Sequence, residues 1–375
     1  MLSKLLKLLK KDFQTLNLIE VSKANLIHNY KYLSSINKKI KIAPVIKSNG
    51  YGHGIENVAK ILEPLNPPFF CVDSLFEAYQ LQKLGIKTPI LITGYTNPDN
   101  LKVRRLPLAF AVYTEDLLEA ISKYQPQTGV HLFVDTGMRR EGVTLEELPN
   151  FLENLKQYPN LKIEGVMSHL ASTNGKDDPI FKSQIKNFKI ALEIIKNYKI
   201  KPKWIHIAAS GGLVNKETNK IISQISNMSR AGISLYGLGD DKNLKPTLKL
   251  ITHLGQIKLL KKGETSGYDG TFKAKKDLVI GILPIGYNDG VDRRLSNKGV
   301  VIINGVVCPI IGRVSMNITT VDISEVKNPQ IGQEVLVYSD NPSAVNSLEN
   351  CAKICNTITY DLLVDLDQSI KRIVI

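Results

Sequence analysis

Short apolar runs recur between about residue 17 and residue 240, and longer segments with helical periodicity separate them. Apolar runs of this length are typical of buried strands, and connections long enough to hold a helix join parallel strands. The pattern predicts eight strands, which are Ile42–Ile46, Phe69–Val72, Ile90–Ile92, Ala109–Val112, Leu132–Val134, Gly165–Ser168, Trp204–Ile207 and Asn227–Ser229. Helices are expected between them, for example at Ile55–Leu62, Ser74–Leu84, Thr114–Lys123, Leu145–Lys156 and Ile180–Asn197. Eight parallel strands close a (β/α)8 barrel, which we expect at residues 17–245.

The pattern changes after about residue 245. Apolar runs there are separated by glycine, proline, asparagine and aspartate, which are typical of turns between antiparallel strands. These runs are Leu278–Ile285, Gly299–Ile303, Val306–Ile311, Thr319–Ile323 and Glu334–Tyr338. We therefore expect an α/β protein in which residues 246–375 form a C-terminal, mainly antiparallel β domain.

Composition and charge narrow the possible partners. Apolar residues make up 43% of the 375 residues, which is enough for a sizeable core, and the formal charge is +14. The excess lysines are scattered without an aromatic-interleaved basic stripe, so a solvated surface is favoured over a nucleic-acid partner. The four cysteines lack the spacing of a zinc site or a redox pair, so we expect no metal and reduced thiols.

The first 16 residues include a stretch, residues 2–11, in which leucines alternate with lysines. Lysines interrupt every apolar run in this segment, which predicts a basic amphipathic extension rather than a signal peptide or a membrane span. We expect the extension to lie on the protein or to fray rather than to bind anionic lipid, and we expect the protein to be cytoplasmic.

Polar residues stand at or just past the ends of five of the predicted strands, and they are Lys47, Asp135, His169, His206 and Arg230. In a (β/α)8 barrel such positions share the C-terminal face, where active sites are built. Ser210 and Gly232 follow the seventh and eighth strands, where barrels of this kind commonly bind phosphate. Each residue alone has an ordinary structural explanation. Together they predict a site for a phosphate-bearing ligand and leave the reaction open.

The segment after the first predicted strand resembles a known signature. VIKSNGYGHG, residues 45–54, is similar to the cofactor-lysine motif of the alanine racemases. Further blocks are similar to the same family, in the family's order, and they are VDTGMRREG, SHLAS, HIAAS, SRAGISLYGL, GETSGYDGTF, PIGYNDG, IGRVSMNITTVDIS and NTITYD. The resemblance runs from about residue 17 to the C-terminus. It implies a barrel with a C-terminal β domain, a homodimer with shared active sites, pyridoxal 5'-phosphate as cofactor, and interconversion of L-alanine and D-alanine that supplies D-alanine for peptidoglycan.

The resemblance also implies two catalytic bases. Lys47 holds the cofactor as a Schiff base and, once the substrate amine displaces it, exchanges the α-proton on one face of the substrate aldimine. Tyr268, contributed by the partner subunit, acts on the other face. A tyrosine ordinarily titrates near pH ~10, so it needs help near neutrality. In the family that help is a chain of hydrogen bonds matched here by His169 and Arg230, with His206 behind them.

The remaining site residues follow from the same resemblance. Arg230 matches the residue that faces the pyridine nitrogen, and because an arginine keeps its proton, that nitrogen stays unprotonated. The phosphate contacts are matched by Tyr51, Ser210, Gly232 and Ile233. The substrate contacts are matched by Arg140 and by the backbone N–H of Met316, and Tyr287 resembles a tyrosine at the entrance of the substrate channel.

The surroundings of Arg140 depart from the family pattern. Arg139 and Glu141 stand where the family has glycine and an aliphatic residue. Phe133 stands where many members carry a carbamylated lysine that orients the arginine. Arg140 is therefore expected to be held in another way.

Three further departures bear on cofactor and substrate. Ala209 replaces an asparagine, Asn317 replaces an aspartate, and Gln368 replaces a tyrosine that binds phosphate. The last two alter charge and width near the substrate, so a racemase of broader specificity, for example for serine or a basic amino acid, stays an alternative. A third hypothesis is a cofactor-binding protein without racemase chemistry. It is disfavoured because such members of the barrel group lack the β domain and its Tyr268.

Overall fold

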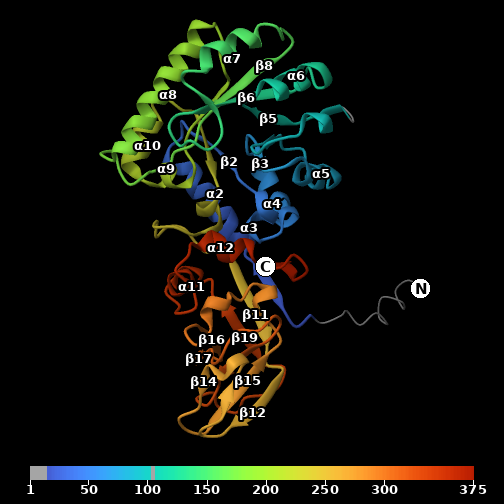
Figure 1. The fold of residues 1–375 in the computed structure, drawn as a ribbon, viewed down its shortest axis with the longest axis vertical. Coiled ribbons are helices and arrows are strands. Elements are labelled where there is room, and N and C mark those ends of the chain that lie inside the picture. Colours follow the sequence, from blue (N-terminus) through green and yellow to red (C-terminus); the bar gives the residue numbers. More distant parts are fainter. Residues whose placement is uncertain (1–14, 103–105) are drawn as a thin grey trace, which may run out of the picture. The chain divides into compact units, whose positions relative to one another are not determined.

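The computed structural model describes residues 15–102 and 106–375, which form two compact units (Figure 1). One unit is Ser22–Thr247, and the other consists of Leu248–Ile375 with the described residues that precede Ser22. The extension predicted for residues 1–16 lies outside the described residues, apart from Thr15 and Leu16. Within the described ranges, none of the helices combines the length and the apolarity that a membrane crossing requires.

The first unit is built on a ring of parallel strands. They are β2 (Lys41–Pro44), β3 (Phe70–Val72), β4 (Ile90–Ile92), β5 (Ala109–Val112), β6 (Gly129–Asp135), β8 (Lys162–Met167), β9 (Trp204–His206) and β10 (Met228–Ala231). Parallel ladders connect β3 through β9 in sequence order and connect β10 to β2, while the two-residue β7 (Val143–Thr144) pairs with the end of β6. A bridge between Val45 and Cys71 continues β2 into β3, and the N–H of Asn227 donates to the carbonyl of Ile205 between β9 and β10. The predicted eight-stranded barrel is confirmed.

Helices cover the outside of these strands (Figure 1). The longer ones are α2 (Lys23–Ile36), α4 (Ile55–Leu62), α5 (Leu75–Lys83), α6 (Glu115–Tyr124), α7 (Leu148–Leu155), α8 (Pro179–Asn197) and α10 (Lys216–Ile222). Helix α8 illustrates the two features that stabilise such helices, which are a capped N-terminus and an apolar face. Asp178 accepts hydrogen bonds from the first free backbone N–H groups, and Phe181, Ile185 and Phe188 recur at helical spacing on its buried face.

The barrel interior is filled in layers by residues that alternate along each strand. One cluster consists of Ala43, Phe69, Cys71, Leu91, Ala109 and Met228, and a second consists of Ala111, Phe133 and Met167. Strand β6 begins earlier than the predicted Leu132–Val134, because the inward-facing His131 interrupts the apolar run that marks a strand in the sequence. Strand β8 likewise begins at Lys162, since Glu164 interrupts the run there.

The second unit consists mainly of antiparallel strands, as predicted. Its largest sheet has the order β17-β16-β19-β11-β1-β20, and its other sheets are β12-β15-β18 and β13-β14. The strand bounds are β1 (Leu18–Val21), β11 (Leu248–His253), β12 (Gln256–Leu260), β13 (Thr265–Ser266), β14 (Phe272–Lys273), β15 (Leu278–Leu283), β16 (Val300–Ile303), β17 (Val306–Pro309), β18 (Thr319–Asp322), β19 (Glu334–Tyr338) and β20 (Lys371–Val374). Two helices, α11 (Leu348–Cys355) and α12 (Thr359–Val364), belong to the same unit.

The first strand of the described chain joins this second unit. Strand β1 pairs antiparallel with β11 and parallel with β20. The compact barrel unit therefore begins at Ser22 rather than at residue 17. The difference arises because an isolated apolar run in the sequence does not show which strands it will pair with.

Candidate active site

Lys47 opens a left-handed turn, α3 (Lys47–Tyr51), directly after strand β2. Ser48, Asn49, Gly50 and Tyr51 have φ angles of 53°, 54°, 63° and 51°. Such a run of L-residues is unfavourable by itself and needs contacts that hold it. The side-chain oxygen of Asn49 accepts from the N–H of Ile55 at 3.0 Å, which ties the turn to helix α4.

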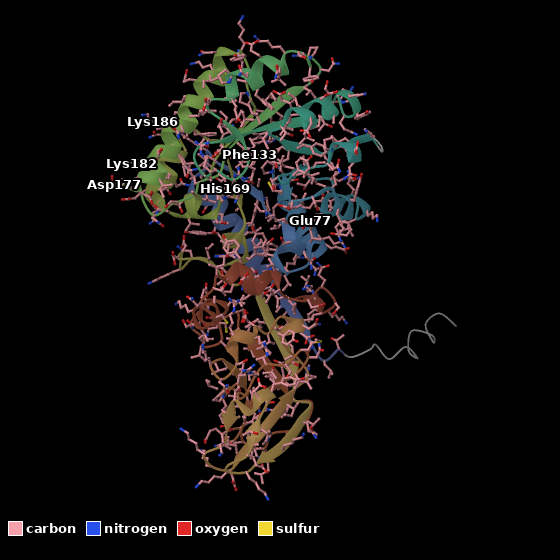
Figure 2. The ribbon with its side chains drawn as sticks, viewed as in Figure 1. Glu77, Phe133, His169, Asp177, Lys182 and Lys186 are labelled. Atoms are coloured by element: carbon pink, nitrogen blue, oxygen red, sulfur yellow. The ribbon has the colours of Figure 1, made fainter. Side chains whose placement is uncertain are left out.

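Two carboxylates on the next βα segment also hold this turn. The Lys47 Nζ lies 2.9 Å from Oδ1 of Asp73, which follows strand β3. Glu77, labelled in Figure 2, accepts from the N–H of Ser48 at 2.5 Å and from the N–H of Asp73 at 2.8 Å. The Lys47 side chain is 37% exposed, so its amine is accessible although it is paired with Asp73.

Beside strand β2 in the ring, after β9 and β10, hydroxyl groups and backbone N–H groups converge in a small cradle. Helix α9 (Ser210–Val214) begins at Ser210, whose Oγ accepts from the N–H of Gly232 at 3.0 Å and from the N–H of Ser234 at 3.3 Å. Ile233 opens the short helix η3 (Ile233–Tyr236). A Cβ atom on Gly232 would lie 2.7 Å from the hydroxyl oxygen of Tyr51. Glycine at 232 is thus required for Tyr51 to reach the cradle.

Arg230 lies at the end of strand β10 and is 4% exposed. Its Nη1 donates to Nδ1 of His206 at 2.6 Å, and its Nη2 donates to the carbonyl of Ser168 at 2.7 Å and to Nδ1 of His169 at 3.1 Å. No partner for its Nε–H is found in the described part of the chain. Burial, and then the charge of Arg140, lower the pKa of Arg230 to about 10, so the guanidinium remains charged at neutral pH.

The arginine determines the tautomers of its two histidine partners. A guanidinium only donates, so Nδ1 of His169 and Nδ1 of His206 must both accept. Burial, followed by the charges of Arg230, Arg140 and Lys47, lowers the pKa of His169 to about 3. Burial and Arg230 lower the pKa of His206 well below its usual value. Both rings are therefore neutral, with their proton on Nε2.

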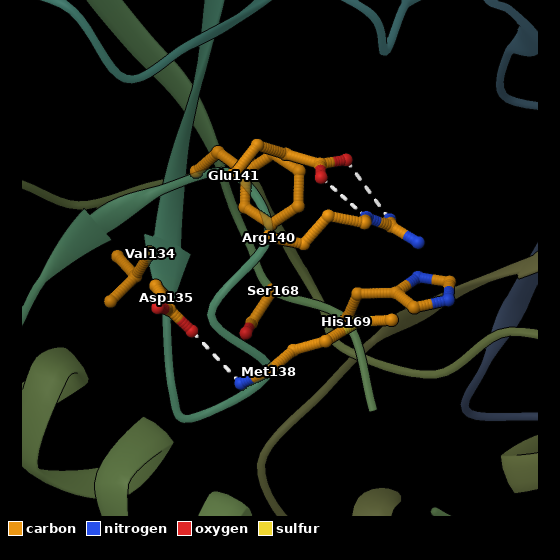
Figure 3. A pocket seen from close by; sticks show the side chains of 8 residues that line it. Val134, Asp135, Met138, Arg140, Glu141, Ser168 and His169 are labelled. Atoms are coloured by element: carbon orange, nitrogen blue, oxygen red, sulfur yellow. Dashed lines mark hydrogen bonds and ion pairs between the residues drawn. The ribbon is translucent and has the colours of Figure 1, made fainter. Parts of the chain in front are cut away.

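Arg140 is held by the residue that follows it. Its Nη2 donates to Oε1 of Glu141 at 2.9 Å, and its Nε donates to Oε2 of the same carboxylate (Figure 3). The two residues line a pocket together with Phe133, Asp135, Met138 and His169. Asp135 shapes the loop between β6 and Arg140, because its Oδ1 accepts from the N–H groups of Gly137, Met138 and Arg139.

Phe133 fills the position at which many members of the resembled family carry a carbamylated lysine. It is buried against Ala111 and Met167, and its ring stands edge-on to that of Tyr113. Phe133 and His169 are both labelled in Figure 2 and line the same pocket. The carboxylate next to Arg140 therefore comes from the loop and not from strand β6.

The site residues expected in the C-terminal region all lie in the second unit. Tyr268 opens the short helix η4 (Tyr268–Gly270) and is 66% exposed. The N–H of Tyr287 donates to the carbonyl of Ser315, and the N–H of Asn288 donates to the carbonyl of Met316. The turn that precedes Tyr268 packs against the same segment, since Gly267 adjoins the N–H of Arg313. Tyr268, Tyr287 and Met316 thus share one exposed region of this unit.

Asn317 has a charged neighbour. Its Nδ2 donates to Oδ2 of Asp289 at 3.3 Å, and Asp289 also accepts from the N–H of Gly286. A negative charge is therefore retained beside position 317, although the residue itself is neutral. Gln368 lies near the C-terminal end of the same unit, where its carbonyl accepts from Arg372.

The roles of three residues near the site were not predicted from the sequence. Asp73 was not singled out, and Glu141 was noted only as a departure from the family pattern beside Arg140. His131 stands two positions before Phe133, and alternation along a strand would have directed both inward. That signal was hidden because His131 lay outside the apolar run that predicted the strand.

Known proteins are similar to this chain over nearly its full length. The family model described as alanine racemase, N-terminal domain, matches residues 21–240, and that described as alanine racemase, C-terminal domain, matches residues 247–374. The alanine racemase of Carboxydothermus hydrogenoformans is 34% identical over 367 residues, which cover 94% of this chain and 98% of the relative. A structure of alanine racemase from Bacillus anthracis with bound L-Ala-P is 28% identical with a TM-score of 0.88, covering 97% of this chain and 96% of that one. A structure of alanine racemase from Bartonella henselae with covalently bound pyridoxal phosphate is 25% identical with a TM-score of 0.85, covering 96% and 100%.

Proposed function

The chain belongs to the alanine racemase family, and on this premise we propose that it interconverts L-alanine and D-alanine with pyridoxal 5'-phosphate as its cofactor. The family is one of pyridoxal-phosphate-dependent isomerases. The observation that best supports the proposal is the buried Arg230, which donates to two neutral histidines near the accessible amine of Lys47.

The residues of the barrel unit fit this cofactor. Lys47 offers an amine for its aldehyde, while Tyr51 and Ser210 offer hydroxyl groups and Ile233 a backbone N–H for its phosphate. Gly232, whose N–H donates to Ser210, leaves room for the Tyr51 hydroxyl beside them. The Nε–H of Arg230, without a partner among the described residues, is free to donate to the pyridine nitrogen. When bound, the cofactor supplies an electron sink for the negative charge that develops on the α-carbon of the amino acid.

The chain itself supplies the bases and their support. The Nζ of Lys47 accepts or returns the α-proton on one face, from a position that strand β2 and its left-handed turn hold fixed. The hydroxyl of Tyr268 of the partner subunit serves the opposite face. His169 supports that tyrosine, because its Nδ1 accepts from Arg230 and its Nε2–H is left to donate outward.

Exposure of the second unit supports a homodimer. Tyr268, Met316, Ile318 and Tyr287 are all large and exposed on this unit, and large exposed apolar groups in one region mark interaction surfaces. We infer that a second copy of the chain covers them and that each site is shared between two subunits. Arg140 and the N–H of Met316 then bind the substrate carboxylate, while Tyr287 lines the entrance.

Alanine remains the proposed substrate despite the departures at Asn317 and Gln368. Asp289 lies next to Asn317 and keeps a carboxylate there, so the electrostatic surroundings resemble those of an aspartate. We also propose that the reaction takes place in the cytoplasm and supplies D-alanine for peptidoglycan, as the resemblance implies.

A product assay tests the function. The purified protein with pyridoxal phosphate is incubated with a panel of L-amino acids, and the D-products are measured. We expect D-alanine to form fastest and Lys47→Ala to lose about a hundredfold or more of the rate, together with the absorption band of lysine-bound cofactor.

Lys60→Ala is the matched control, because Lys60 is an exposed lysine on helix α4 that pairs with the exposed Glu56. It should keep both the rate and the band. Racemisation that persists in Lys47→Ala would overturn the proposal. Faster turnover of serine or a basic amino acid than of alanine would replace it by the broader-specificity alternative.

A further inference from the structure

A third histidine lies behind Arg230, deeper in the barrel. His131 is fully buried on strand β6, and its Nδ1 lies 2.8 Å from Nε2 of His206. The ring of Phe69 stands edge-on to it, with the centroids 5.1 Å apart. The chain of contacts therefore runs from His169 through Arg230 and His206 to His131.

The direction of every hydrogen bond in this chain follows from Arg230. The guanidinium donates to Nδ1 of His206, so the proton of neutral His206 is on Nε2. That N–H points at Nδ1 of His131, which must accept it. His131 is neutral as well, because burial and Arg230 lower its pKa to about 3. Its own proton is then on Nε2, an atom with no partner within the described ranges.

Removing the acceptor on His131 would leave His206 with two unfavourable choices. It could keep its Nε2–H buried without a partner. It could instead move the proton to Nδ1, where an N–H would face the Nη1 donor of Arg230. The first choice makes the Nε2–H tautomer of His206 less stable, and the second disturbs the guanidinium that contacts His169.

We propose that His131 is a positioning residue, whose Nδ1 holds His206 as the Nε2–H tautomer and thereby fixes the Arg230 guanidinium. Its effect on turnover rests on the proposed function, but the tautomer itself does not. A histidine that only filled space could be replaced by a phenyl ring, which has no N–H of its own to bury without a partner at position 131. In this structure the Nε2–H of His131 is buried without a partner among the described residues, while Nδ1 of the same ring accepts from His206.

The neighbouring strand makes room for this histidine. A Cβ atom on Gly165 of strand β8 would lie 2.3 Å from Nδ1 of His131, the atom that accepts from His206. Glycine at 165 is thus matched to the ring at 131. The variant Gly165→Ala offers a way to displace the acceptor without removing it.

The unmodified protein provides the first test. Nitrogen-15 NMR of protein labelled in its six histidines reports which ring nitrogen of each carries the proton, and it needs neither cofactor nor turnover. Resonances are assigned with single-histidine variants. We expect His131, His169 and His206 to be neutral and protonated on Nε2 at pH 7. A proton on Nδ1 of His206, or a doubly protonated ring there, would overturn the proposal.

Two replacements at 131 then separate positioning from packing. His131→Phe fills the space without an acceptor, whereas His131→Asn offers a side-chain oxygen in place of Nδ1. We expect kcat to fall on the order of tenfold in His131→Phe, with a smaller change in KM for alanine, and to fall less in His131→Asn. Gly165→Ala should resemble His131→Phe.

The outcomes are distinguishable from failure of the proposed function. If the unmodified protein forms no D-alanine, the function is wrong, and the NMR pattern still decides the tautomer. If it does racemise and His131→Phe is at least as active as His131→Asn, His131 only fills space and the inference is wrong.

Discussion

At the residue scale, the surroundings of Arg140 differ from the family pattern at two positions, 133 and 141, and the change at 141 compensates for the change at 133. Phe133 carries no charge and is packed among apolar side chains of the barrel. The adjacent Glu141 supplies the carboxylate that binds both Nε and Nη2 of Arg140. Two parallel hydrogen bonds to one carboxylate fix the plane of a guanidinium, which a single contact does not. The Arg140 side chain is 51% exposed, so this pair orients the arginine more than it stabilises the fold.

The pair predicts a modest loss of catalytic efficiency in Glu141→Gln. The amide keeps the shape of the side chain but removes the charge, and exposed ion pairs contribute up to ~1 kcal/mol, so kcat/KM for alanine should fall by up to about fivefold. Thermal stability should hardly change. Glu146→Gln, at an exposed position of the following segment, is the matched control. Equal kinetics in the two variants would show that Glu141 does not hold Arg140.

At the element scale, the left-handed turn after strand β2 positions the proposed catalytic lysine. Four successive residues after Lys47 have positive φ, and Gly52 continues the run with a φ of 79°. Neighbouring elements hold the turn through Asn49 and Glu77. Strained backbone of this kind persists where the surrounding structure over-determines it, which is common at functional sites.

Gly50→Ala should destabilise the protein more than a comparable change elsewhere. A Cβ at Gly50 would lie 3.0 Å from Cγ2 of Val58 and 3.3 Å from the backbone nitrogen of Ile55. Gly85 has a similar φ of 74° but open space around it, so Gly85→Ala meets only the left-handed conformational penalty of ~1–2 kcal/mol. Denaturant unfolding of the cofactor-free variants compares the two. We expect the larger loss, and weaker pyridoxal phosphate binding, only in Gly50→Ala. Equal losses of stability in the two variants would mean that Ile55 and Val58 of helix α4 move to accommodate the added methyl group.

At the scale of the whole molecule, we propose that two chains share each site. The groups around Lys47 belong to the barrel unit, whereas Tyr268, Tyr287 and Met316 belong to the unit built on β11 and its neighbours. In a two-fold symmetric dimer the same contact occurs twice, so two equivalent shared sites follow.

Mixing two inactive variants tests whether the sites are shared. Lys47→Ala and Tyr268→Ala are purified separately, unfolded or dissociated together, and reassembled. If each site combines Lys47 of one chain with Tyr268 of the other, a mixed dimer has one intact site. The mixture should then regain about a quarter of the wild-type activity, because about half of randomly formed dimers are mixed and each has one working site of two. Activity that stays at the level of the single variants would contradict shared sites, as would a fully active monomer in light scattering.

The sequence by itself determined the succession of strands and helices and the place of Lys47, Arg230, His169 and His206 at the ends of strands. Those features are local, because buried parallel strands must be apolar and barrel chemistry lies at their C-terminal ends. Tertiary structure decided what the local pattern leaves open. Strand β1 pairs with β11 and β20, His131 turns inward to accept from His206, and Glu141 rather than a residue at 133 binds Arg140. Partners in a sheet and hydrogen bonds across a barrel join residues far apart in the chain, and the spacing of residues along the sequence does not encode which of them will meet.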